Sequence, residues 1–279
     1  MKKKRRLNNI IYHIGMILGS FIMIYPLVWL FASSLKTNAE YYGSPYSLIP
    51  QSWAWSNYVE GWKGFARLTF ATFYKNSFFM TITCTLAGVF TSALVAYGMS
   101  RMRFKGRGFW FGAMMLTMCI PGQVLQVPTY LFYHTIGWTG TFLPIIVPAF
   151  TAGAATVFMM MQFMRGIPKD MDEAATIDGC GPVQIFTRIT LPLIKPALGI
   201  SLITGFIGNW QNYMGALLYL NKPELYPVSL ALTLYTDETG TNYGPMFAMS
   251  ALSLVPVLTL YFIFQKSLTQ GITITGLKG

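Results

Sequence analysis

The chain has 279 residues, of which 53% are hydrophobic and only 10% are charged, and its mean hydropathy is +0.47. This composition excludes an ordinary soluble domain, in which about 25% of residues are charged, and indicates a protein embedded in a membrane. The net charge of +11 does not indicate nucleic-acid binding, because most of the basic residues gather in the loops on one side of the predicted membrane spans.

Six stretches are apolar enough and long enough to cross a bilayer as helices, which takes about 20 residues. We therefore predict an all-α polytopic membrane protein with spans at 10–33, 77–99, 109–132, 141–163, 196–219 and 246–265. The segments between them are a basic N-terminus, an external segment, a long loop, a second external loop and a tail, at 1–9, 34–76, 164–195, 220–245 and 266–279. Prolines such as Pro26, Pro121 and Pro256 are expected to bend the spans that contain them.

The basic residues also set the predicted orientation of the chain. Lys and Arg are concentrated in residues 1–9, in the loop after residue 100 and in the 164–195 loop, whereas the external segments hold few. By the positive-inside rule, both termini and the 164–195 loop are cytoplasmic.

No pattern of catalytic or metal-binding residues is present in the sequence. Cys84 and Cys119 fall in predicted spans and Cys180 in a loop, and the two histidines, His13 and His134, stand far apart. The sequence also lacks the Gly-x-x-x-x-Gly-Lys-[Ser/Thr] motif that binds ATP phosphates. We predict that the chain is not an enzyme and binds no cofactor or metal.

The stretch PKDMDEAATIDGCGPVQIFTRITLP, residues 168–192, is unusual because it holds four of the nine carboxylates of the chain, Asp170, Asp172, Glu173 and Asp178. Asp170 is predicted to cap a short helix, with Glu173 completing a capping box. Gly179 is suited to end that helix in a left-handed conformation. The first half of the loop is therefore predicted to be a short capped helix.

A second short helix is predicted after Gly181, with Pro182 in its first turn and Pro192 as its end. Neither helix is long enough to cross a membrane. On the second helix, an apolar stripe formed by Val183, Phe186 and Ile189, with Ile185 beside it, could pack back onto the spans. The loop is either a solvated connector or a docking element for a cytosolic partner, and its compact helix-turn-helix pattern favours docking.

These residues resemble a known family. The sequence EAATIDG followed by ITLP resembles the cytoplasmic EAA loop of the membrane subunits of binding-protein-dependent ATP-binding-cassette (ABC) importers. The stretches NSFFMTITCTLAGVFTSALVAYGMSRMRFKGRG, IPGQVLQVPTYLFYHTIGWTGTFLPIIVP and QKSLTQGITITGLKG extend the resemblance over nearly the whole chain. They are similar to the carbohydrate branch of the family, and specifically to the shorter, six-span subunit of the maltose-transporter type.

The resemblance implies the type I ABC importer permease fold in a bacterial-type inner membrane. It implies that the loop is a coupling helix that docks on a cytoplasmic ATPase dimer, which carries the ATP and Mg²⁺, and that the chain works by alternating access. Glu173 would be the polar anchor, Ala174 and Ala175 the close contact and Gly179 the turn; the full implied docking set is Asp170, Glu173, Ala174, Ala175, Asp178, Gly179, Ile189 and Pro192. The other implied partners are a second, homologous membrane subunit and an extracellular sugar-binding protein, which the 221–245 loop would approach.

Polar residues in the fifth predicted span mark a possible substrate pathway. At helical spacing Asn209, Asn212 and Tyr213 share a face, and Trp210 flanks it. Amides and aromatic rings suit a hydroxylated sugar, but these groups could equally bond to the sister subunit. Gln123 and Gln126, between two prolines, pose the same alternatives.

Two other functional classes fit the sequence less well than an importer does. An ion-coupled secondary carrier would need an acidic residue in a span or an inverted repeat, and the predicted spans contain neither Asp nor Glu. An intramembrane enzyme would need a nucleophile, a base or a metal cluster. Within the importer class, a sugar or oligosaccharide is the expected substrate, and a glycerol-phosphate or another polyol is the alternative.

Overall fold

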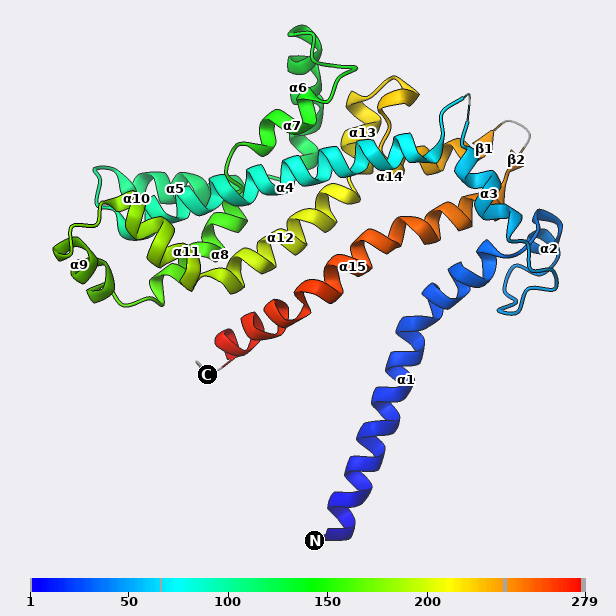
Figure 1. Ribbon diagram of the computed structural model, residues 1–279, viewed down its shortest axis with the longest axis horizontal. Coiled ribbons are helices and arrows are strands. Elements are labelled where there is room, and N and C mark those ends of the chain that lie inside the picture. The colour runs from blue at the N-terminus through cyan, green and yellow to red at the C-terminus, as the bar shows by residue number, and fades with distance from the viewer. Residues whose placement is uncertain (1, 66, 238–239, 277–279) are drawn as a thin grey trace. The chain divides into compact units, whose positions relative to one another are not determined.

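The computed structural model describes residues 2–65, 67–237 and 240–276, and nearly all of its regular structure is helical (Figure 1). The chain divides into two compact units. One consists of Met1–Ala71 with Ala231–Val255, and the other of Thr72–Leu230 with Pro256–Gly279.

The first unit is built on helix α1, two short helices and the beginning of α15. Its elements in chain order are α1 (Lys2–Ser34), α2 (Asn38–Gly43), α3 (Ser56–Lys63), the 3₁₀ turn η3 (Leu232–Tyr235), strands β1 (Thr236–Asp237) and β2 (Gly240–Thr241), and α15 (Tyr243–Gly276) up to Val255. The two strands form an antiparallel hairpin in which Thr236 pairs with Thr241. Helices α1 and α15 continue through Pro26 and Pro256 without a break.

A lysine is fully buried at the end of α1. The side chain of Lys36 has no exposed surface, and its Nζ donates hydrogen bonds to the backbone carbonyls of Ser44, Pro45 and Ser47, at 3.2, 3.4 and 2.5 Å. The indole Nε1 of Trp29 donates to the same Pro45 carbonyl at 2.9 Å. These bonds fix the irregular segment after α2, because a buried ammonium group is stable only when its donors are satisfied.

The second unit contains the long helix α4 and the shorter helices that pack along it. Its elements are α4 (Phe70–Arg101), α5 (Arg107–Met118), α6 (Gly122–Thr135), α7 (Leu143–Ala149), α8 (Ala154–Arg165), α9 (Asp170–Ile177), α10 (Pro182–Ile185), the π turn η1 (Phe186–Thr190), α11 (Leu191–Leu193), α12 (Lys195–Trp210), α13 (Tyr213–Tyr219), η2 (Pro223–Leu225) and α14 (Val228–Ala231). Helix α4 has no proline, so its 32 residues remain one helix.

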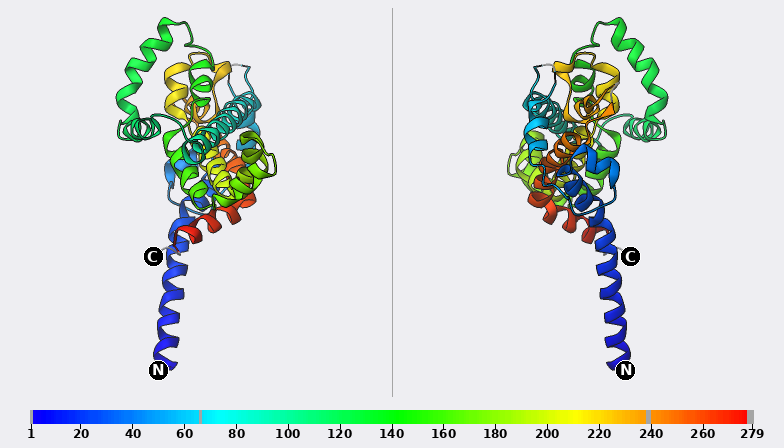
Figure 2. Two further views of the ribbon diagram at one scale, coloured as in Figure 1. Left: turned by 90° about the vertical axis from the view of Figure 1, so that its left-hand side faces the viewer. Right: turned by 90° about the vertical axis from the view of Figure 1, so that its right-hand side faces the viewer.

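By length and composition, four helices of the described residues can cross a membrane, Asn9–Ser34, Phe70–Arg101, Leu143–Arg165 and Tyr243–Gln265. Two bent pairs raise this number to six if each pair forms one span: α5 with α6, bent by 96°, and Pro182–Leu193 with α12, bent by 77°. The first bend lies at Pro121, where a break was expected, and Figures 1 and 2 show α6 turning away from α5. The predicted span at 196–219 is interrupted, because α12 ends at Trp210 and α13 begins at Tyr213.

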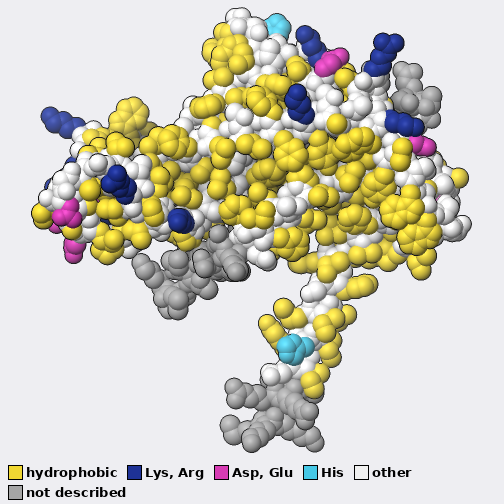
Figure 3. Space-filling view, in the orientation of Figure 1, with side chains coloured by type: hydrophobic (Ala, Val, Ile, Leu, Met, Phe, Trp, Pro, Cys, Tyr) yellow, Lys and Arg dark blue, Asp and Glu magenta, His cyan; other side chains and the backbone are white. Residues whose placement is uncertain are grey.

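The main core of the second unit lies where α4, α8, α12 and the 164–195 loop meet. Its buried residues are Ala93, Ala96, Tyr97, Val157, Met160, Met161, Met164, Ala175, Ile185, Phe186, Ile194 and Ala197. Alanines on α4 permit a close approach, and methionines of α8 fill the irregular space beside them. In this unit, hydrophobic side chains extend along the helices, whereas acidic side chains gather where α9 lies (Figure 3). The loop is therefore part of the folded core rather than an appendage.

Candidate functional site

Helix α9 begins one residue earlier than the sequence predicts. Lys169 is the N-cap, Asp170 is the first residue of the helix, and no side chain caps the helix N-terminus. The predicted Asp170 cap and its capping box with Glu173 are therefore wrong. The backbone amides of Asp172 and Glu173 instead donate to the Lys169 carbonyl, at 2.9 and 3.1 Å. The three acidic residues occupy the first turn, where they are favoured by the positive end of the helix dipole.

The end of α9 is as predicted. Gly179 has φ = +82°, a left-handed conformation that glycine adopts without strain. The amide of Gly179 donates to the Thr176 carbonyl at 3.1 Å, and the amide of Cys180 donates to the Ala175 carbonyl at 2.9 Å. This pair of bonds is a Schellman motif, and it turns the chain sharply into the second half of the loop.

The second half of the loop begins with Pro182 in the first turn of α10, as predicted. Its end differs from the prediction, because the helical path continues through Pro192 to Leu193. The π turn η1 explains this difference. The Leu191 amide donates to the Phe186 carbonyl, five residues earlier. This wider turn accommodates Pro192, which has no amide hydrogen and would clash with the preceding turn of a regular α-helix.

The loop has one face in the core and one face in solvent. Ala175, Ile185 and Phe186 are buried against α4 and α8, and Ile189 packs against the same cluster. Ile177 and Val183 are 87% and 74% exposed. These two apolar side chains therefore lie on the solvent face of the loop, where they are available to a partner.

The two alanines of the EAA sequence lie on different faces of α9. Ala175 is 7% exposed and belongs to the buried core cluster, whereas Ala174 is exposed. Asp170, Glu173 and Asp178 are also exposed, as is Pro192. Of the predicted docking residues, the structure therefore places Ala175 and Ile189 against the core of their own chain.

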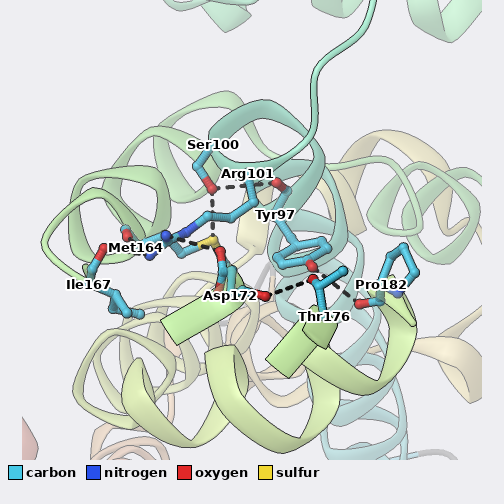
Figure 4. A network of polar contacts seen from close by, with 8 residues as sticks. All are labelled: Tyr97, Ser100, Arg101, Met164, Ile167, Asp172, Thr176 and Pro182. Atoms are coloured by element: carbon cyan, nitrogen blue, oxygen red, sulfur yellow. Dashed lines mark hydrogen bonds and ion pairs between the residues drawn. The ribbon is translucent and has the colours of Figure 1, made fainter. Parts of the chain in front are cut away.

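A buried arginine joins the loop to α4 and α8 (Figure 4). Arg101, the last residue of α4, forms an ion pair with Asp172 of α9, with 3.1 Å between Nη1 and Oδ2. Its Nη2 donates to the backbone carbonyls of Met164 and Ile167, at 2.5 and 2.8 Å. The two side chains of the pair are only 5% and 20% exposed. In the sequence Arg101 is only one of several basic residues that set the orientation, and its partner is 71 residues away.

Two further contacts of α4 lie beside this pair. One turn before Arg101, the Tyr97 hydroxyl donates to the Pro182 carbonyl at 3.1 Å. The Ser100 hydroxyl contacts the Met164 sulfur at 3.2 Å. The C-terminal turn of α4 therefore holds both helices of the loop, α9 through Arg101 and α10 through Tyr97.

The residues predicted for a substrate pathway have partners within the chain. The Asn209 amide donates to the Thr85 hydroxyl of α4 at 3.2 Å and to the Gly205 carbonyl at 2.8 Å. Trp210 is buried and stacks on Phe206, with ring centroids 5.6 Å apart and planes 11° apart. The bond between Asn209 and Thr85 joins α12 to α4.

The predicted shared face of Asn209, Asn212 and Tyr213 does not form, because the helix is interrupted between the first and the other two. Asn212 is the N-cap of α13, and its Oδ1 accepts the Gly215 amide hydrogen at 3.0 Å. An asparagine that can cap a new helix competes with continuation of the old one. Tyr213 is 37% exposed. Gln123 is exposed and Gln126 half-exposed, both on α6, beyond the bend that follows α5.

The part of the chain that the structure describes contains no group of three or more His, Cys, Asp or Glu side chains arranged to hold a metal ion. What the loop offers instead is a two-helix element packed on the core, with apolar and acidic groups on its outer face.

Comparison with known proteins identifies the family. Residues 88–274 match the family described as binding-protein-dependent transport system inner membrane component. The chain is 31% identical to the trehalose/maltose transport system permease protein MalG of Thermococcus litoralis, over 98% of both chains. It is 30% identical to the arabinooligosaccharides transport system permease protein AraQ of Bacillus subtilis, over 93% of this chain and 92% of that protein.

A solved structure has the same fold. A chain of a bacterial ABC transporter involved in the import of the acidic polysaccharide alginate superposes with a TM-score of 0.81, covering 94% of this chain and 96% of its own length at 22% identity. A second structure, of the bacterial alginate ABC transporter in complex with an alginate pentasaccharide-bound periplasmic protein, superposes with a TM-score of 0.67 at 18% identity. The chain shares a helical fold with these importers, and its family match includes the whole 164–195 loop. It therefore belongs to the binding-protein-dependent transport system inner membrane components and is a multi-pass permease subunit of an ABC transporter, not itself an enzyme.

Proposed function

We propose that this chain is one of two homologous membrane subunits of an importer that moves a sugar or oligosaccharide into the cell by alternating access. The substrate class is supported by the names of relatives that cover nearly the whole chain, which refer to arabinooligosaccharides and to trehalose and maltose. In the proposed arrangement six spans cross the membrane: the four long helices, the bent pair of α5 and α6, and a span that contains α12 but not the cytoplasmic segment Pro182–Leu193. Both termini lie in the cytoplasm. Energy comes from ATP and Mg²⁺ on a separate ATPase dimer.

The observation that carries the proposal is the two-faced 164–195 loop. Its inner face is fixed in the core through Ala175, Ile185 and Phe186. Its outer face presents Ile177 and Val183 together with the exposed carboxylate of Glu173. A partner that covers the apolar groups and pairs with Glu173 would bind to a loop that is packed on α4 and α8. Movement of the partner would then move these helices, as a coupling element requires.

The outer face has the composition of a small docking interface. Ala174 has no side chain beyond Cβ, so a partner can approach the backbone of α9 closely, and Ile177 lies three residues further along the same helix. Complete burial of an isoleucine side chain stabilises a complex by about 1.5–3 kcal/mol. In the proposed complex Glu173 is the polar anchor, and Asp170 and Asp178 lie at the rim.

The proposed external partner is a sugar-binding protein. The segment 221–245, which includes η2, η3 and the β1–β2 hairpin, is the proposed contact. A periplasmic protein is present in one of the related alginate transporter structures, which supports such an assembly. Residues 238 and 239, in the middle of this segment, lie outside the described residues.

The test is an Ile177→Asp variant of the chain, co-expressed with the other transporter subunits. We expect it to insert in the membrane but to lose the ATPase subunit during purification, because a charge replaces an apolar contact. Ile49→Asp is the matched control, since Ile49 is 76% exposed in the segment between α2 and α3, and it should retain the ATPase. Equal retention of the ATPase by both variants would contradict the proposed docking surface.

A further inference from the structure

Arg101 occupies a position where three helices meet. Helix α8 ends at Arg165, and the carbonyls of Met164 and Ile167 at that end both accept hydrogen bonds from Arg101 Nη2. Helix α9 begins at Asp170, and Asp172 in its first turn binds Nη1. One guanidinium, fixed to the last turn of α4, therefore contacts the end of one helix and the beginning of the next.

The charges at this junction favour the arrangement. The last carbonyls of a helix carry partial negative charge and attract a cation, whereas the first turn of a helix favours an anion. Arg101 supplies the cation for α8, and Asp172 supplies the anion for α9, while the two side chains also attract each other. Arginine suits this role better than lysine because its planar group offers separate donors to several acceptors at once.

We propose that α4 receives the movement of the 164–195 loop, and that Arg101 is the positioning residue that makes α4 follow α9. Helices α8 and α12 are joined to the loop by the chain itself. Among the described residues, α4 meets the loop through packing and through the polar contacts of Tyr97 and Arg101. This proposal rests on the proposed function, since it concerns the route by which movement of the docking loop reaches the membrane spans.

The pair is held by one bond rather than two. Arg101 Nε and Asp172 Oδ1 are buried and have no hydrogen-bond partner. An ion pair of this kind is sensitive to the loss of either member, because the remaining charge is left in a site with little solvent. The consequences are unequal. Arg101 still binds two carbonyls when Asp172 is neutral, whereas Asp172 loses the one charged partner it has among the described residues when Arg101 is removed.

The experiment measures substrate imported per ATP hydrolysed by the complete transporter in proteoliposomes. For Arg101→Ala we expect the ATPase to remain bound and active while import per ATP falls by about tenfold or more. The substitution removes the ion pair with Asp172 and two hydrogen bonds to carbonyls, and the loss of one charge-assisted hydrogen bond alone corresponds to about tenfold. Arg101→Lys should restore part of the ratio, because lysine keeps the charge but not the fork of donors. Asp172→Asn should lower the ratio less than Arg101→Ala.

The control is Arg103→Ala. Arg103 lies two residues beyond Arg101 and is exposed, so its removal should leave import per ATP unchanged. A purely structural role for Arg101 would reduce the amount of assembled complex but not the ratio in the complexes that assemble. If the Arg101→Ala complex does not assemble, Asp172→Asn and Arg101→Lys test the proposal in its place. Import per ATP equal to that of Arg103→Ala in both of these variants would overturn the proposal.

The Ile177→Asp variant separates this proposal from the proposed function. If Ile177→Asp releases the ATPase but Arg101→Ala keeps a normal ratio, the docking surface stands and the route through α4 is wrong. If Ile177→Asp has no effect on ATPase binding, the docking surface itself is wrong.

Discussion

Leucine at position 175 should destabilise the folded chain, whereas leucine at position 174 should weaken binding of the ATPase. The two alanines are neighbours in one helix, but Ala175 is 7% exposed in the core cluster and Ala174 is exposed on the outer face. The same substitution therefore probes two different surfaces one residue apart.

The expected difference follows from the surroundings of each side chain. Leucine adds three carbon atoms, and at Ala175 these must enter the cluster that contains Met164 and Phe186. Overpacking of this kind costs about 1–3 kcal/mol of unfolding free energy, whereas exposed substitutions usually change it by no more than about 0.5 kcal/mol. For a chain of this size each kcal/mol lowers the melting temperature by about 2–4 °C.

The assay compares the two variants and the parent chain by thermal unfolding in detergent, followed by tryptophan fluorescence, and by retention of the ATPase subunit. Ala175→Leu should melt several degrees lower. Ala174→Leu should melt like the parent but retain less ATPase, because the added side chain holds the partner away from the helix. Equal melting temperatures for the two variants would refute the assignment of the two faces.

Two other substitutions test local features of the structure. In Gly179→Ala the added Cβ meets no atom within 4 Å but lies on a residue with φ = +82°, so backbone strain alone should lower the unfolding free energy by about 1–2 kcal/mol. Gly181→Ala is the control, because Gly181 has equally open surroundings and φ = −74°. Equal thermal stability of the two variants would contradict the left-handed turn. Lys36→Met should cost about 1–3 kcal/mol, because the carbonyls of Ser44 and Ser47 lose the buried ammonium donor, whereas the Pro45 carbonyl keeps the bond from Trp29. Burial lowers the pKa of Lys36 from its ordinary value of 10.5, so the unfolded chain binds this proton more tightly than the folded chain does. The unfolding free energy of the parent chain should therefore rise as the pH increases from the lowered pKa towards 10.5. Thermal unfolding measured across this pH range should show the rise in the parent and not in Lys36→Met.

Features that depend on a few neighbouring residues were predictable from the sequence. Gly179 ends α9 and Pro182 begins α10 because each residue type has a strong local preference. The bend at Pro121 follows from the missing amide hydrogen of proline. The family resemblance, carried by the EAATIDG and ITLP stretches, agrees with the match over residues 88–274.

Features that depend on distant residues were not predictable. Ala174 and Ala175 are chemically identical, and only the packing of α9 on α4 and α8 decides which one is buried. Arg101 looks like one more basic residue after a membrane span, and its role as the partner of Asp172 appears only when the chain is folded. The break between Trp210 and Tyr213 also follows from a competition, in which capping by Asn212 prevails over continuation of an apolar helix.

The π turn at Phe186–Thr190 has a consequence for how the loop could change in evolution. Such a turn holds one residue more than the α-helical turn it replaces, and each residue of a helix advances the direction of its side chains by about 100°. Each residue of the wider turn advances the side chains by less, so deleting one residue here would restore regular helical bonding and leave α12 facing α4 much as before. The pairing of Asn209 with Thr85 would be kept, whereas Pro192 would meet the carbonyl of a regular α-helical turn. The extra residue of this short segment therefore accommodates the proline and does not set the orientation of the helices that follow.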